Sequence, residues 1–210
     1  MKRIFKRLII LLFSLAVLPL WLLYRLEGLL LTRKRAFYGY SQLLCLFPGI
    51  IGNYIRFAFY RMTISSLGDD SCISFGVTFA HPDIRIGRGV YIGSWCNLGL
   101  CTIEDDVLFG TDVHVISGFN QHGHADISVP MREQRGELLN VRIGRDSWIG
   151  NKTVVGNHVG EKSIVGAASL VVQEVPPYSV AVGNPAKVIR DRRQASFKNP
   201  GNAGGSPASS

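Results

Sequence analysis

The chain has 210 residues, enough for one substantial core with an appendage but few for two full domains. Its 23 basic side chains exceed the 15 acidic ones, and the whole excess lies in residues 1–62, where Glu27 is the one acidic residue. Basic charge confined to an apolar segment fits a membrane surface. No aromatic-plus-basic pattern or zinc-finger spacing elsewhere supports a nucleic-acid partner, so we exclude that class.

The first predicted element is an apolar run over residues 8–23, preceded by a basic cluster within residues 2–7. No small-residue cleavage site follows the run, so we expect it to be retained and not removed as a signal peptide. It is shorter than the ~20 residues of a straight transmembrane helix. Basic residues also follow it at 33–35, which favours cytoplasmic placement of both ends. We therefore predict an in-plane anchor, or a hairpin that turns near Pro19, instead of a simple span.

Residues 36–62 interleave aromatic and basic side chains, and Pro48-Gly49 divides them into two pieces. The pattern suits helices at a membrane interface, although a soluble helix packed on the main domain would share it. We predict that residues 1–62 form a helical membrane-association segment. The protein would then be peripheral or monotopic on the bacterial inner membrane, with the rest of the chain in the cytoplasm.

A period of six residues begins near Ile73. Each unit has an aliphatic first residue, usually a glycine at the second position, and a small residue at the fifth. Clear units are residues 86–91, 92–97, 103–108, 109–114, 143–148, 149–154, 159–164 and 165–170. We expect the first and fifth residues to point inward and the glycine to permit a tight turn. One unit cannot bury its apolar face alone, so the units must stack into a continuous ladder.

The predicted fold is therefore mainly β, a parallel β-helix over residues 63–192 with a helical N-terminal extension. Residues 193–210, rich in Gly, Ser, Asn and Pro, are predicted to be a disordered tail. The four cysteines form no Cys-x-x-Cys pair and imply no disulfide. Cys96 stands at a fifth position, where a small buried residue is expected, so we interpret it as a core residue and not as a nucleophile.

The stretch from about Ile73 to Arg190 resembles the hexapeptide-repeat acyltransferases, in particular the branch that acetylates sugars and polysaccharides. Residues 175–179 and 183–190 are similar to the segment that ends the repeats in this family. The resemblance implies a left-handed parallel β-helix, a homotrimer, and acetyl-CoA or another acyl-CoA as co-substrate, with no metal.

Residues 117–140 interrupt the repeats with a non-periodic segment, and a long loop of this kind in a compact domain is usually functional. In the galactoside and maltose acetyltransferases, which the chain resembles, a loop at this point carries the catalytic histidine. By position His122 is the best match and His124 the second. An imidazole that titrates near neutral pH can accept the proton of a sugar hydroxyl as the hydroxyl attacks a thioester.

The resemblance also implies two acceptor-binding residues. Asn97 stands where related sugar acetyltransferases bind the acceptor, and an amide can donate and accept hydrogen bonds together. It could equally be a corner residue in a left-handed conformation. Trp148 matches an aromatic residue beside the family's cleft, although a surface or trimer-interface role is also open at its outward sixth position.

For the cofactor, the resemblance points to Gly166, Ala167 and Ala168, where small side chains leave room for a pantetheine arm. Lys187 and Arg190 match basic family positions near the nucleotide phosphates, which such side chains bind well. The family often has a Thr-Lys pair after this coil, but here residues 172–173 are Val and Gln, which puts one of the contacts in doubt.

The sequence thus predicts an acyl-CoA-dependent O-acyltransferase that acts on a sugar hydroxyl. The acceptor is expected to be lipid-linked or polymer-bound, as in exopolysaccharide, capsule or O-antigen synthesis, and a small soluble sugar is the alternative. Two alternatives remain open at this point. One is a metal enzyme like the γ-type carbonic anhydrases, given five histidines, and the other is a non-catalytic β-helix that scaffolds a membrane assembly.

Overall fold

The computed structural model describes the backbone of residues 2–194 and the side chains of residues 5–194. Most of the tail predicted over 193–210 therefore lies outside the described residues. The chain begins with three helices, α1 (Lys2–Leu30), α2 (Arg33–Cys45) and α3 (Gly49–Thr63). The break between α2 and α3 falls at Pro48-Gly49, as the sequence predicts.

The α1 helix runs without a turn through Pro19, so the predicted hairpin at this residue is wrong. A proline inside a helix removes one backbone hydrogen bond, and here the inner face of α1 is packed along α2 and α3 on both sides of it. Tyr24 illustrates this packing, because its ring contacts the rings of Phe37, Tyr40 and Phe59. The in-plane anchor remains as the prediction for this segment.

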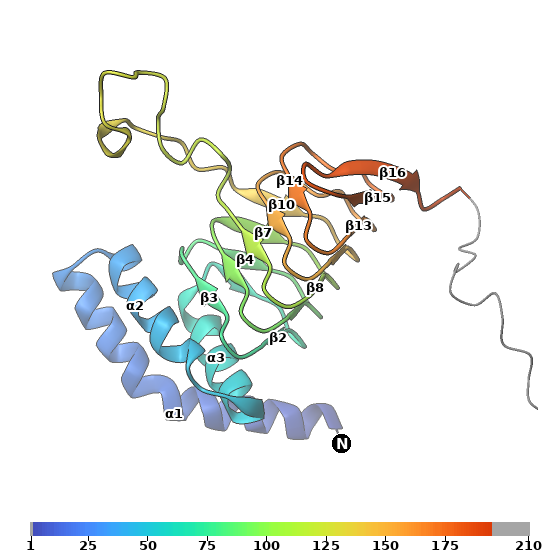
Figure 1. Cartoon of the computed structure of the whole chain (residues 1–210). Coiled ribbons are helices and arrows are strands. Elements are labelled where there is room, and N and C mark those ends of the chain that lie inside the picture. The colour runs from blue at the N-terminus through green and yellow to red at the C-terminus, as the bar shows by residue number, and fades with distance from the viewer. Residues whose placement is uncertain (1, 195–210) are drawn as a thin grey trace, which may run out of the picture.

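The rest of the described chain is a ladder of short strands (Figure 1). The strands are β1 (Ser66–Leu67), β2 (Cys72–Ile73), β3 (Thr78–Phe79), β4 (Arg85–Ile86), β5 (Tyr91–Ile92), β6 (Asn97–Leu98), β7 (Cys101–Ile103), β8 (Leu108–Phe109), β9 (His114–Val115), β10 (Val141–Ile143), β11 (Trp148–Ile149), β12 (Val154–Val155), β13 (Ile164–Val165), β14 (Leu170–Val171), β15 (Ser179–Val182) and β16 (Lys187–Asp191). A short 3₁₀ helix, Met131–Glu133, lies in the loop between β9 and β10.

The strands form three parallel sheets that make the faces of a triangular prism. Face A contains β1, β4, β7 and β10, and face C contains β3, β6, β9, β12 and β14. Face B contains β2, β5, β8, β11, β13 and β15, with β16 added antiparallel at its end. Up to β12 successive strands visit the three faces in turn, and in the last coils face A is continued by the single bridges of Val159 and Val175, so each coil lies one strand spacing above the last. This is the β-helix that the six-residue period predicts.

Position five of the repeat points inward, as expected: Val90, Cys96, Val107 and Val113 are buried. The expected role of the second-position glycine is wrong, however. The left-handed backbone that makes the corners falls at position four, for example at Gly89 (φ 66°) and Asp106 (φ 61°).

The second-position glycines are required for a different reason, which is the close approach of the next coil. A Cβ added to Gly93 would lie 2.3 Å from the carbonyl oxygen of Gly110, and one added to Gly144 would lie 2.3 Å from the amide nitrogen of Glu161. Both clashes are with backbone atoms, which cannot rotate away.

One hydrophobic core runs from the helices into the prism. The α2 and α3 helices cover the open end of the first coil, and Arg56 of α3 is buried at this junction. Its guanidinium donates hydrogen bonds to the carbonyl oxygens of Leu44, Phe47 and Ile73 and to Oδ1 of Asn53. Burial lowers the pKa of Arg56 from its usual value. Through its hydrogen bonds the side chain joins α2, α3 and β2.

Candidate functional site

The loop between β9 and β10 leaves the prism at the corner between faces C and A. Its two legs pair near the base, where the amide of Leu139 donates to the carbonyl of Ser117 (2.9 Å) and that of Glu137 to the carbonyl of Asn120 (2.7 Å). Beyond this stem the loop projects from the body as an arm (Figure 1). Its tip includes Ile127, whose side chain is fully exposed.

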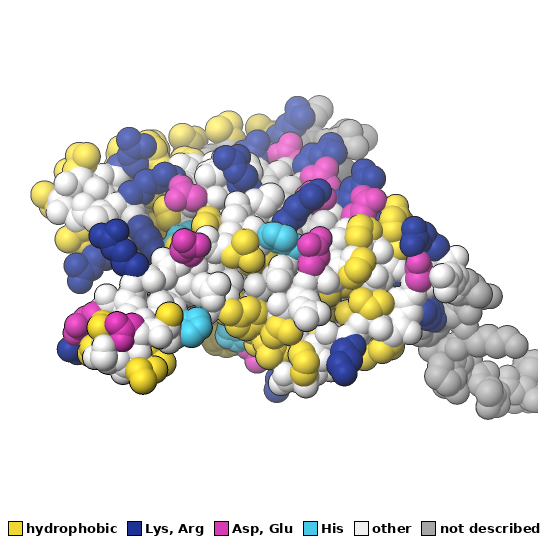
Figure 2. Space-filling view, turned by 90° about the horizontal axis from the view of Figure 1, so that it is seen from above, with side chains coloured by type: hydrophobic (Ala, Val, Ile, Leu, Met, Phe, Trp, Pro, Cys, Tyr) yellow, Lys and Arg dark blue, Asp and Glu magenta, His cyan; other side chains and the backbone are white. Residues whose placement is uncertain are grey.

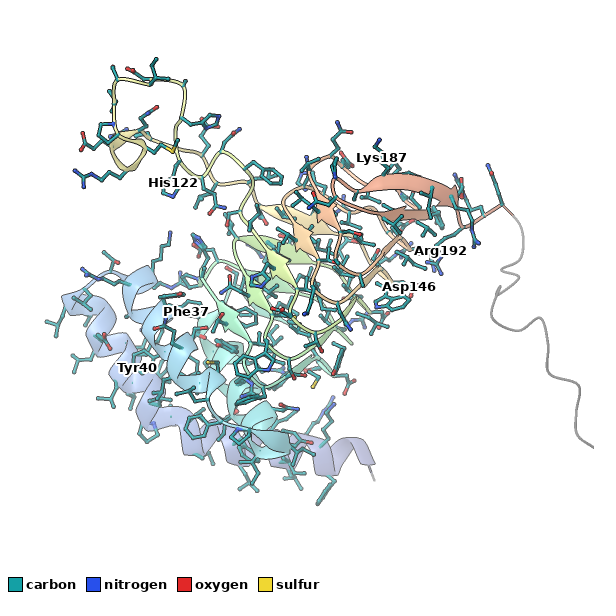
Figure 3. All side chains as sticks on the ribbon, in the orientation of Figure 1. Phe37, Tyr40, His122, Asp146, Lys187 and Arg192 are labelled. Atoms are coloured by element: carbon teal, nitrogen blue, oxygen red, sulfur yellow. The ribbon has the colours of Figure 1, made fainter. Side chains whose placement is uncertain are left out.

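His122 and His124 both lie on this arm, and both side chains are exposed. The backbone nitrogen of His122 lies so close to Gly136, on the opposite leg, that a Cβ there would stand 2.5 Å away. Nδ1 of His124 lies 3.3 Å from the carbonyl oxygen of His122. Figure 3 shows His122 on the arm, away from the body of the molecule. Figure 2 shows a histidine side chain beside the arm, next to apolar surface.

Asn97 lies on β6, on face C, and is half-buried. It does not have a left-handed backbone, so the interpretation as a corner residue is wrong. Its Nδ2 donates a hydrogen bond to Oγ1 of Thr78 (2.7 Å), its neighbour on β3. Asn97 lies in the same sheet as β9, the strand that leads into the arm, so Asn97 and the arm share one side of this chain.

His114 is a residue that the sequence reasoning did not assign to the site. It lies on β9 in register with Asn97, three residues before the arm begins, and its Nε2 is 3.1 Å from Oδ1 of Asp112. A carboxylate that holds an imidazole in one orientation is a common feature of sites that move protons. The repeat itself carries the signal, because it places residues 97 and 114 at the same outward sixth position on one face.

Trp148 lies on a different side of the prism. It is on β11 of face B, in register with Leu108 and Ile164, and 52% of the side chain is exposed. Face B lies opposite the corner from which the arm emerges. The arm and Trp148 of one chain are therefore not brought together within that chain.

Face B carries a column of exposed apolar side chains in register: Tyr91 on β5, Leu108 on β8 and Trp148 on β11. Large apolar side chains that are exposed and adjacent often mark a surface that contacts another molecule.

The predicted cofactor residues lie farther along the prism. Gly166, Ala167 and Ala168 form the corner between faces B and C after β13, with Ala168 at φ 56° and both alanines exposed. A Cβ on Gly166 would stand 2.7 Å from Cγ1 of Val182 in the next coil. The small side chains thus leave an open corner just below the C-terminal hairpin.

Lys187 and Arg190 lie on β16 of that hairpin, in register with Val182 and Val180 of β15. Lys187 is exposed, and Figure 3 shows it on the same upper side of the prism as the arm. The structure therefore places the corner residues and Lys187 near the C-terminal end of the prism, and Arg190 is in register with Trp148 on face B through Val180 and Ile164.

Ion pairs follow the corner between faces A and B. They join Arg142 to Glu104, Arg145 to Glu161 and Lys162 to Asp146, at 2.5 to 2.8 Å. Acidic and basic side chains alternate along one edge of the molecule in Figure 2. Exposed pairs of this kind contribute little stability, so this edge is best regarded as solvated surface.

The described residues include no cluster of three or more His, Cys, Asp or Glu side chains that could hold a metal ion. Cysteine chemistry also finds no support, because Cys96 and Cys101 are buried and the arm has no cysteine. Burial raises the pKa of the Cys96 thiol to about 11 and also raises that of Cys101.

Comparisons with known proteins identify relatives of this chain, although no protein-family model matches the sequence. A probable acetyltransferase of Mycobacterium tuberculosis is 33% identical over 129 residues, which is 60% of this chain but 35% of that protein. The galactoside O-acetyltransferase of Escherichia coli is 29% identical over 147 residues, 65% of this chain and 68% of that one. The chain therefore spans only part of these relatives.

Solved structures give the same picture. A galactoside acetyltransferase in complex with coenzyme A aligns with a TM-score of 0.65 and 25% identity, covering 82% of this chain and 88% of that one. A hexapeptide-repeat acetyltransferase of Vibrio cholerae in complex with acetyl-CoA aligns with a TM-score of 0.62 and 25% identity, over 75% and 86%. With its three-sided β-helix and interrupting loop, the chain is similar to the hexapeptide-repeat acetyltransferases.

Proposed function

We propose that this protein transfers an acetyl group from acetyl-CoA to a hydroxyl of a sugar. The observation that carries the proposal is the histidine-bearing arm, which interrupts a regular β-helix beside Asn97. Solved relatives that bind coenzyme A or acetyl-CoA support the donor, and the relative named for galactoside acetylation supports a sugar acceptor.

In the proposed mechanism His122 is the general base. The imidazole accepts the proton of the sugar hydroxyl while the hydroxyl oxygen attacks the carbonyl carbon of the thioester. The C–S bond then breaks, and the imidazolium donates this proton to the departing thiolate of coenzyme A. Asn97 holds the acceptor hydroxyl through its amide, and the corner at Gly166–Ala168 with Lys187 and Arg190 binds the donor.

The proposed active unit is a homotrimer. Trp148 lies on face B, opposite the corner that carries the arm, so the two can meet only if face B of one subunit receives the arm of the next. The exposed column on face B and the exposed Ile127 at the arm's tip support such a contact. A cyclic trimer would repeat this site at each interface. The finer proposal is a lipid-linked or polymer-bound acceptor.

The first prediction tests the base. His122→Ala should lower turnover about 10²- to 10⁴-fold, the usual contribution of a general base, with acetyl-CoA affinity unchanged. His124→Ala and His114→Ala are the matched controls, and both should keep more activity than His122→Ala. If His122→Ala retained more than about a tenth of wild-type turnover, the base would have to be reassigned.

Mixing variants tests the shared site. If the arm of one subunit meets face B of the next, subunits with His122→Ala and subunits with Trp148→Ala can together form intact interfaces. Coexpression of the two weak variants should restore about a quarter of wild-type activity, the share expected from random mixing in a trimer. No recovery would contradict a site shared between His122 of one subunit and Trp148 of the next. If equilibrium dialysis detected no acetyl-CoA binding by the wild-type chain, a scaffold role would be favoured instead.

A further inference from the structure

The outer face of α1 is apolar and uncovered. Although its inner face packs on α2 and α3, the outer side exposes a row of large apolar residues: Phe5, Leu8, Leu11, Leu12, Leu15, Leu18, Leu22, Leu23, Leu26, Leu29 and Leu30. Leu29 is 82% exposed and Leu12 65%. We call this row the leucine face. A helix that is apolar all round is buried in protein or in lipid, and here only the inner half meets protein.

The apolar surface continues beyond α1 at the corner between α2 and α3. Leu46, Phe47, Ile50 and Ile51 are exposed there. Ile50 lines a cavity of about 210 Å³ together with Lys6 and Ile10 of α1, so the corner adjoins the first turns of that helix. Monomeric soluble proteins rarely expose apolar patches of more than a few hundred Å², so a surface of this extent indicates a partner.

The α1 helix is fixed flat against the base of the β-helix. At one end Lys6 pairs with Asp70 of the first coil (2.5 Å), and just beyond the other end Arg33 pairs with Asp83 (3.4 Å). Between them the indole of Trp21 donates a hydrogen bond to the carbonyl of Met62 (3.2 Å). The helix is roughly 44 Å long at 1.5 Å per residue and lies across the whole base (Figure 1).

These contacts argue against a transmembrane helix. The helix is long and apolar enough to cross a bilayer by length and composition, yet such a crossing would pull it from α2 and α3. It would expose Val17 and Tyr24, which are buried now, and leave the aromatic cluster around Tyr24 uncovered.

The charges beside the leucine face identify the partner as anionic. The first 62 residues hold ten basic side chains and one acidic side chain. At one edge, a hollow of about 580 Å³ is lined by Lys6, Arg7, Arg61 and Arg88 with Asp69 and Asp70, next to Ile10 and Leu11. At the other end of α1, residues 33–35 add three exposed basic side chains.

We propose that the leucine face lies in the interfacial layer of a bilayer rich in anionic lipids. The apolar side chains enter the boundary between headgroups and acyl chains, as in other in-plane amphipathic helices. The basic side chains at the two ends of α1 contact the anionic headgroups, and the hollow beside Arg7 accommodates a lipid phosphate. The β-helix then stands away from the membrane on its first coil. This inference does not depend on the acceptor or on the catalytic residues.

The test is flotation of the full chain with vesicles. Protein kept in mild detergent is mixed with vesicles of phosphatidylcholine alone or of phosphatidylcholine with phosphatidylglycerol, the detergent is removed, and the sample is centrifuged in a density gradient. Wild-type protein should float with the anionic vesicles, and high salt should weaken the binding because surface charges are then screened.

Two variants probe the two components. Leu12→Glu combined with Leu23→Glu places charges on the leucine face and should lower vesicle binding at least tenfold. Arg7→Gln and Arg35→Gln should each lower binding to anionic vesicles about fivefold, with little effect on neutral ones. Ile189→Glu, at an exposed apolar position on β16 at the end of the β-helix away from α1, is the control for an added charge and should float like the wild type.

Three results would overturn the proposal. Equal flotation on neutral and anionic vesicles, unaffected by salt, would contradict the anionic partner. Unchanged flotation of the Leu12/Leu23 variant would show that another surface binds. If the wild-type chain stayed at the bottom of the gradient in an assembly that Leu12→Glu dissociates, a second copy of the chain would be the occupant instead. Circular dichroism of every variant separates these results from misfolding.

Discussion

At the scale of single residues, the glycine at the second position of each repeat leaves the least room for change. Gly93 is the clearest case, because the three atoms nearest to an added Cβ are all backbone atoms of the next coil, at 2.3 to 2.9 Å. Real Cβ atoms do not approach other heavy atoms so closely, so the coils would have to separate.

A Gly93→Ala substitution is therefore expected to destabilise the fold by about 2 kcal/mol or more, as overpacking of a rigid core does. Gly39→Ala is the matched control, since Gly39 lies in α2 and an added Cβ would meet nothing within 4 Å. It should stabilise the chain by up to about 1 kcal/mol, the helix propensity gained over glycine. Thermal unfolding of both variants measures the difference, and equal melting temperatures would contradict the close-approach account.

This residue shows why part of the repeat could be read from the sequence and part could not. The period of six and the inward positions follow from which residues are aliphatic or small, and burial of Val90 and Cys96 confirms them. The second-position glycine was assigned to a turn because glycine is common in turns. Only the spacing between coils reveals its steric role, and that spacing is absent from any single repeat. The residues with positive φ at the turns include aspartates, lysines and Trp95.

At the scale of elements, the junction between the helices and the β-helix is held by one buried cation. Arg56 contributes hydrogen bonds to three carbonyl oxygens and one amide oxygen from α2, α3 and β2. Without the guanidinium, these buried acceptors would lose their partners, and an unsatisfied buried polar group costs about 1–3 kcal/mol.

An Arg56→Leu substitution should thus lower the free energy of unfolding by about 3 kcal/mol or more. Arg61→Leu on the same helix is the control, because Arg61 is exposed and its pair with Asp69 is a surface ion pair that contributes at most about 1 kcal/mol. Chemical denaturation gives both values. Limited proteolysis should cut the helices of the Arg56 variant first, and a variant as resistant as the wild type would refute this role.

The helices were the part of the fold that the sequence predicted least well. Their ends follow from Pro48-Gly49 and from Thr32, whose hydroxyl caps α2 by accepting from the amide of Arg35. Their packing does not follow, because α1 is apolar on every side and no periodicity distinguishes its inner from its outer face. For the same reason the sequence does not distinguish a hairpin at Pro19 from a continuous in-plane helix, whereas packing on both sides of Pro19 keeps the helix continuous.

At the scale of the whole molecule, the candidate site is built from parts that the sequence could name but not assemble. The resemblance to the family predicts His122, Asn97 and Trp148 as site residues. Which of them share a face depends on the number of coils between them and on the corner from which the arm leaves. That geometry puts Asn97 beside His114 and sets Trp148 on another face, which is why the site is proposed to form between subunits.

If α1 lies in the plane of a membrane as proposed, it does not carry the chain across the bilayer, and the β-helix stays on the side where it was made. Acyl-CoA is a cytosolic donor, and the proposed reaction requires the same side. The basic residues at 2–7 and 33–35 flank the apolar run on both ends, and basic flanks tend to remain in the cytoplasm.

We therefore predict that both ends of the chain are cytoplasmic in a bacterial cell. A fluorescent protein that matures only in the cytoplasm should be bright when fused to the C-terminus, and an alkaline phosphatase fusion at the same point should be inactive. An N-terminal tag should resist protease added to spheroplasts until the cells are lysed. As a control, replacing residues 1–31 with a cleavable signal peptide should reverse both fusion signals. An active phosphatase on the intact chain would mean that α1 spans the membrane, which contradicts both its in-plane placement and a cytosolic donor, because the β-helix would then lie on the far side.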